Sequence, residues 1–125
     1  LTSSEWEEVY QKASQFQAFK IEYGPLKSFL PYPCIWYAVQ PVERILDIRE
    51  ALHQTGFFNL SLPHTEGFIP HMTITEGLSG PRVDERLLAD LQTQSQSGVF
   101  SLSEISWIKP DKNFSFSVEW KIPLG

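Results

Sequence analysis

The feature that most constrains the fold is a strict alternation of apolar and polar residues near the C-terminus. Serine, glutamate and lysine separate the apolar residues, which are Phe114, Phe116, Val118, Trp120 and Ile122. Successive side chains of a strand point to opposite faces, so this pattern predicts a strand with one core face and one solvent face. The turn residues from Pro110 to Asn113 pair it with a strand from Ile105 to Lys109. We interpret the aromatic residues as core rather than as a platform for stacking nucleobases.

Three segments carry helical signals. In the first, Thr2 is the expected N-cap, Glu5 completes a capping box, and Leu1 packs on Trp6. Its apolar stripe is Trp6, Val9, Tyr10 and Ala13. The second helix is expected to open at Pro41, end near His53 and be followed by Gly56 in a left-handed conformation. The third helix runs through Leu87, Leu88 and Leu91.

Two strands are expected in the first half of the chain. Phe19, Ile21 and Tyr23 alternate with polar residues and predict a half-buried strand that ends at Gly24-Pro25. The segment from Cys34 to Val39 is apolar at every position, as in a central strand covered on both faces. Helices and antiparallel strands together predict an α+β fold.

Length and composition narrow the class of protein. A chain of 125 residues with 42% hydrophobic residues is expected to form a single domain over residues 1–125. Ten basic and fifteen acidic residues give a net charge of −5, which argues against general affinity for duplex nucleic acid. The only cysteine, Cys34, lies in an apolar strand and indicates a core residue in a reducing compartment. With no apolar membrane span and no signal peptide recognised, we expect a cytoplasmic protein; oligomeric state is not predicted.

The candidate functional motif is the segment Pro70-His71-Met72-Thr73-Ile74-Thr75-Glu76. Strand alternation predicts His71, Thr73 and Thr75 on one face and Ile74 on the apolar side, with His71 and Thr73 roughly 7 Å apart. An imidazole exchanges a proton near neutral pH, and a neighbouring hydroxyl donates a hydrogen bond to a phosphate oxygen. His71 and Thr73 are therefore the candidate catalytic residues, with Thr75 and Glu76 as possible supporting groups.

Other chemistries fit the sequence less well. The spacing of the three histidines matches no zinc motif, so we expect no metal site. A serine hydrolase elbow and a phosphate-binding glycine loop are both lacking, which leaves no predicted cofactor. Metal-independent acid–base chemistry on a phosphodiester remains.

In its motif and its order of elements, the chain resembles the 2H phosphoesterases, the superfamily of the 2′-5′ RNA ligase-like proteins and cyclic nucleotide phosphodiesterases. The likeness extends from the N-terminal helix through Cys34-Ile35-Trp36-Tyr37-Ala38-Val39 to the His71 motif. It implies a two-lobed fold in which antiparallel sheets line a central cleft and helices lie outside. It also implies that two histidines act on RNA ends or cyclic nucleotides, by hydrolysis or 2′-5′ ligation, while the hydroxyl residues hold phosphate oxygens. His71 would be one acid or base and Thr73 one such donor.

The resemblance also implies a first His-x-Thr or His-x-Ser strand. We expect no second copy of the motif in this chain, on the interpretation that His53 and His64 lack a hydroxyl residue two positions on. Because the chain opens at Leu1 and its only methionine is Met72, we expect an incomplete protein whose N-terminal strand or strands, with that motif, precede Leu1. The alternative is a catalytically inactive binding or interaction domain that keeps the fold. A His-x-Thr or His-x-Ser in the encoded sequence before Leu1 would favour the enzyme.

Overall fold

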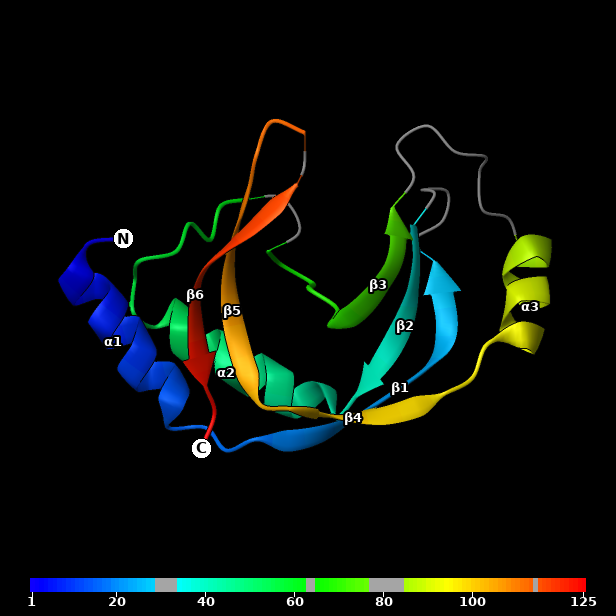
Figure 1. Cartoon of the computed structure of the whole chain (residues 1–125), viewed down its shortest axis with the longest axis horizontal. Helices are drawn as coiled ribbons and strands as arrows, with labels where there is room; N and C mark the ends of the chain where they lie inside the picture. Colours follow the sequence, from blue (N-terminus) through cyan, green and yellow to red (C-terminus); the bar gives the residue numbers. More distant parts are fainter. Residues whose placement is uncertain (29–33, 63–64, 77–84, 114) are drawn as a thin grey trace. The chain divides into compact units, whose positions relative to one another are not determined.

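The computed structural model describes residues 1–28, 34–62, 65–76, 85–113 and 115–125. These residues form three helices and six strands, shown in Figure 1. The helices are α1 (Ser3–Ser14), α2 (Val42–His53) and α3 (Glu85–Gln94), and the strands are β1 (Phe19–Ser28), β2 (Cys34–Gln40), β3 (His71–Glu76), β4 (Gly98–Leu102), β5 (Glu104–Pro110) and β6 (Phe116–Pro123). Every strand pairing with a resolved register is antiparallel, which confirms the α+β class.

The chain divides into two compact units. The first unit contains Leu1–Lys20, Leu46–Glu66 and Ser101–Gly125, and the second contains Ile21–Ile45 and Gly67–Phe100. None of the helices in the described part of the chain is both long and apolar enough to cross a membrane.

Helix α1 begins as the sequence predicts. The Thr2 side chain accepts a hydrogen bond from the backbone N–H of Glu5 at 3.2 Å, and the Glu5 carboxylate accepts one from the backbone N–H of Thr2 at 2.8 Å. This reciprocal capping box satisfies N–H groups that have no partner within the helix. Val9 and Ala13 then face the core of the first unit, where they pack with Ile122 of β6.

The second unit is built on a four-stranded sheet with the order β3-β2-β1-β4. Figure 1 shows β1, β2 and β3 side by side, with α3 next to β1. The prediction that β1 ends at Gly24-Pro25 is wrong, because β1 continues to Ser28. The pairing of β1 with β2 shifts register at a bulge between Tyr23 and Leu26, and the strand continues beyond it. Gly24 in this bulge has a φ of 116°, a conformation that glycine adopts without steric cost.

Helix α3 covers one face of this sheet. Leu26 of β1 and Ile35 of β2 are buried, and Leu88 and Leu91 of α3 pack against them. A side chain of α3 also reaches the bulge, where Oε1 of Gln92 accepts a hydrogen bond from the backbone N–H of Leu26 at 2.6 Å. The opposite face of β1, β2 and β3 carries the candidate site.

The β5–β6 hairpin departs from its predicted burial. Ile122 is only 2% exposed, whereas exposure rises toward the tip through Trp120 (39%), Val118 (53%) and Phe116 (61%). The core prediction therefore holds at Ile122 and is wrong for the outer half of β6; Phe114 lies outside the described residues. Helix α1 supplies the cover near Ile122, and Trp6 stacks on Trp120 with ring centroids 4.4 Å apart.

Candidate functional site

The register of β2 and β3 places the two candidate residues on one face of the sheet. His71 lies opposite Ala38, and Thr73 lies opposite Trp36. Residues directly opposite each other in an antiparallel pair project to the same side, so His71, Thr73, Trp36 and Ala38 share a face. This is the face opposite to the Ile35–Leu26 cluster that α3 covers. The strand thus presents an imidazole and a hydroxyl together, as alternation predicts.

A backbone carbonyl and an aromatic ring lie beside the His71 ring. Its Nδ1 lies 2.7 Å from the carbonyl oxygen of Ile69. Because a carbonyl oxygen only accepts, Nδ1 carries the proton, and Nε2 bears the lone pair of the neutral ring. The Trp36 ring lies at a centroid distance of 5.5 Å and an angle of 59°. The imidazole is half-buried and the Thr73 side chain is exposed, so neither is sealed in a core.

Ile74 does not follow the predicted alternation. Its side chain is 51% exposed, so its expected place on the apolar side is wrong. The register shifts between Ile35 and Trp36, which leaves Ile74 as the extra residue of a bulge on β3, at the edge of the sheet. The side chains of Thr75 and Glu76 lie outside the described residues.

The register adds a charged residue that sequence inspection missed. Lys27 of β1 lies opposite Trp36, which in turn lies opposite Thr73. The three residues form one row across the sheet, and Lys27 projects to the same face as the candidate pair. Two strand spacings separate Lys27 from Thr73, or about 10 Å between Cα atoms. No local motif marks Lys27, because its position depends on the bulge in β1.

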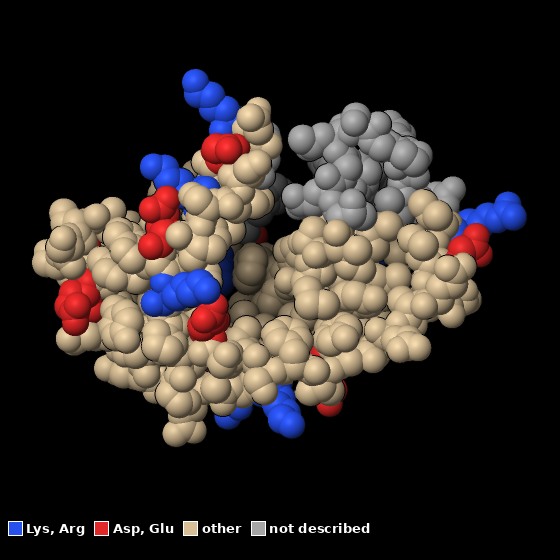
Figure 2. Space-filling model, viewed as in Figure 1, with Lys and Arg blue, Asp and Glu red and all other residues tan. Residues whose placement is uncertain are grey.

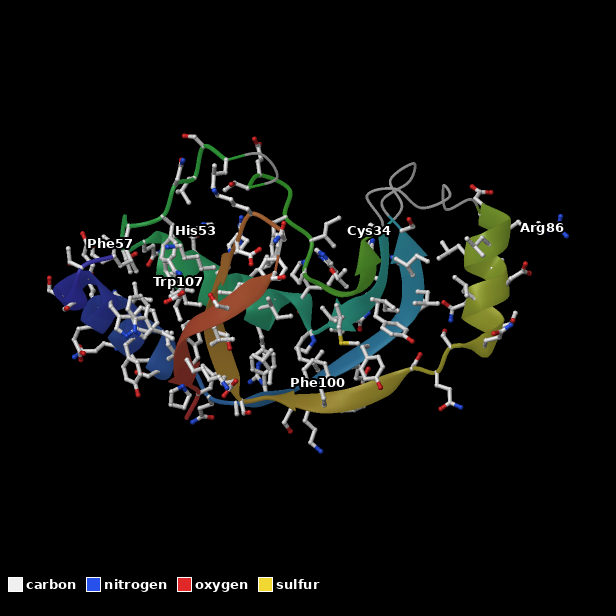
Figure 3. All side chains as sticks on the ribbon, turned by 45° about the horizontal axis from the view of Figure 1, so that its top comes forward. Cys34, His53, Phe57, Arg86, Phe100 and Trp107 are labelled. Atoms are coloured by element: carbon white, nitrogen blue, oxygen red, sulfur yellow. The ribbon has the colours of Figure 1, made fainter. Side chains whose placement is uncertain are left out.

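The other two histidines occupy different settings. The prediction that His53 lacks a hydroxyl residue two positions on is wrong, because Thr55 follows it at the His-x-Thr spacing. His53 is the last residue of α2 (Figure 3), and the Thr55 hydroxyl donates a hydrogen bond to the Leu52 carbonyl at 2.7 Å. This His-x-Thr closes a helix and does not present two side chains from a strand. His64 lies outside the described residues.

The remaining features of the site are the distribution of charge on the surface and the groups that could bind a ligand. Across the described surface visible in Figure 2, basic and acidic side chains are interspersed rather than gathered by sign. Within the described ranges, no three His, Cys, Asp or Glu side chains come together as a candidate metal centre. The groups at hand are therefore an imidazole with a defined tautomer, a hydroxyl and an ammonium group on one face. They suit proton transfer and the binding of an anionic oxygen.

Comparison with known proteins assigns the chain to a family. No curated protein matches the chain. The family model described as the 2′-5′ RNA ligase superfamily matches residues 4–113, which include all of the second unit, with β3, and most of the first unit, but not β6. Because the match spans most of the sequence, the chain belongs to the 2′-5′ RNA ligase superfamily.

Proposed function

We propose that this protein processes a phosphodiester at an RNA end or in a cyclic nucleotide, with His71 as one acid–base group and Thr73 as a donor to a phosphate oxygen. The observation that carries the proposal is the shared face of His71 and Thr73 in an antiparallel sheet. Family membership supports the class of reaction. The choice between hydrolysis and ligation is left to the assay below.

The hydrogen bond to Ile69 supports the role of His71. With the proton held on Nδ1, Nε2 can take a proton from water or a ribose hydroxyl, or return one to a departing oxygen when the ring is charged. A second group must serve the opposite side of the phosphorus, and the family resemblance assigns that role to another histidine. One positioned acid or base contributes about 10²–10⁴-fold to the rate.

Thr73 and Lys27 would interact with the negative charge of the phosphate group. A hydroxyl aimed at a non-bridging oxygen stabilises charge that grows in the transition state. The Lys27 ammonium, farther along the same row, would attract the anionic substrate to this face. Neither role needs a cofactor, and we propose that the reaction proceeds without a metal ion.

A pair of substitutions at Thr73 tests the proposal. Thr73→Val removes the hydroxyl with little change in shape, whereas Thr73→Ser keeps it. In buffer with EDTA, we expect wild-type turnover of a 2′,3′-cyclic nucleotide or a 2′-5′-linked dinucleotide. The valine variant should lose about 10²–10³-fold in kcat, the scale of one oxyanion donor, and the serine variant should stay within a few fold of wild type. Equal activity of both variants, or abolition by EDTA, would contradict the mechanism.

Two further proposals concern the protein as a whole. The family match covers residues from both compact units, so we propose that they form one 2H domain with the substrate bound in a cleft. Cys34, the one cysteine of the sequence, is buried, and we propose a cytoplasmic location, where thiols stay reduced.

A further inference from the structure

A polar hollow lies on the second unit near the start of β4. Its volume is about 310 Å³, and its lining includes Glu22 of β1, Gln40 of β2 and Ser97 just before β4. The side chains of all three residues are exposed, so their polar groups are accessible. A carboxylate, an amide and a hydroxyl thus line a space with room for several water molecules, and Tyr23, Gly24, Gly98 and Val99 complete its lining.

Two residues that line the hollow, Glu22 and Gln40, project to the same face as the candidate pair. Gln40 lies two residues beyond Ala38 on β2, and Ala38 is the residue opposite His71. Glu22 lies opposite Gln40 on β1. Side chains at every second position share a face, so His71, Gln40 and Glu22 project to the same side. One step of about 7 Å along the strand and two strand spacings put the Cα atoms of Glu22 and His71 about 12 Å apart.

Two glycines allow the segments around the hollow to approach each other closely. A Cβ atom on Gly24 would overlap the Ser97 side chain, and one on Gly98 would overlap the Tyr23 ring. The Tyr23 ring also lines the hollow and packs on Tyr37 at a centroid distance of 5.2 Å. The close approach of β1 to the residues around Gly98 therefore forms one wall of the hollow, beside Glu22 and Gln40.

We propose that this hollow is the nucleobase subsite of the enzyme and that it prefers guanine. The inference rests on the proposed function. If the phosphate of a nucleotide binds at His71 and Thr73, the base of the same nucleotide can extend to Gln40 and Glu22. Guanine presents two adjacent N–H donors on its Watson–Crick edge, and a carboxylate accepts both. Uracil presents a single N–H between two carbonyl oxygens. The partial negative charges of these oxygens are repelled by a carboxylate. Gln40 has both a donor and an acceptor and would bind the neighbouring edge.

The test compares guanosine and uridine ligands in wild type, Glu22→Gln and the control Glu8→Gln. Glu8 is an exposed carboxylate on α1, so the control removes the same charge from the first unit. We measure kcat/KM for the two 2′,3′-cyclic nucleotides, and calorimetric binding of 3′-GMP and 3′-UMP. Wild type and the control should favour guanosine in both assays. Glu22→Gln should lower the guanosine-to-uridine ratio about tenfold, the scale of one paired contact to a base edge.

The binding assay separates the two proposals. An unchanged ratio in Glu22→Gln, or no preference for 3′-GMP in wild type, would overturn the guanine subsite even if His71 and Thr73 prove essential for turnover. If the protein shows no turnover but prefers 3′-GMP in a way that depends on Glu22, the proposed reaction is refuted and the guanine subsite is supported. If neither 3′-nucleotide binds, the subsite is refuted.

Discussion

Replacing Gln92 with alanine should destabilise the protein through the β1 bulge. The side-chain Oε1 of Gln92 accepts a hydrogen bond from the backbone N–H of Leu26 at 2.6 Å, and this bond joins α3 to the strand where its register shifts. Alanine would leave a partly buried backbone donor without that acceptor, which costs about 1–3 kcal/mol. The bulge also determines that Lys27 faces the same side as Thr73, so the bond supports the site indirectly.

Urea unfolding measures this effect, and Gln94→Ala is the matched control. Gln94 is the exposed last residue of the same helix, so both variants make the same change of side chain on α3. We expect the unfolding midpoint of Gln92→Ala to fall with an unchanged slope, and that of Gln94→Ala to stay within about 0.5 kcal/mol of wild type. A difference between the two variants below about 0.5 kcal/mol would refute a stabilising role for this hydrogen bond.

Two further predictions address the site and the core. Lys27→Gln should raise KM for an anionic substrate at low salt and leave kcat unchanged. The rise in KM should be smaller at high salt, because salt screens an exposed charge. Lys12→Gln on α1 is the control, and equal shifts of KM in the two variants would exclude a specific role for Lys27. Ile122→Ala should lower the free energy of unfolding by about 2–5 kcal/mol, because Ile122 is packed in the core. Val118→Ala, at an exposed position of the same strand, should cost about 0.5 kcal/mol or less, and equal losses would contradict the assigned core.

Local signals predicted most of the elements. The capping box at Thr2 and Glu5 appears as expected, and Gly56 follows α2 with a φ of 79°. These features depend on residues within one turn of each other, which is why the sequence alone reveals them. Strand alternation likewise placed His71 and Thr73 on one face.

The errors arise where tertiary packing decides. Ile74 is apolar, yet its position in a bulge on an edge strand leaves it half exposed. Val118 alternates as a core residue should, but the described neighbours of β6 bury only the Ile122 end. The bulge at Gly24 extends β1 and aligns Lys27 and Glu22 with their partners on β2. No local pattern contains that register, so the candidate phosphate and base contacts could not be found before the sheet was known.

The most direct test of the central claim compares His71→Ala with His53→Ala. Both residues are half-buried histidines followed two positions later by threonine, but one lies on β3 and the other ends α2. Turnover of the same cyclic nucleotide in EDTA should fall about 10²–10⁴-fold in His71→Ala, because one acid–base group is lost. His53→Ala should remain within a few fold of wild type. Full activity in His71→Ala, or equal losses in the two variants, would contradict the assignment of His71 as the acid–base residue.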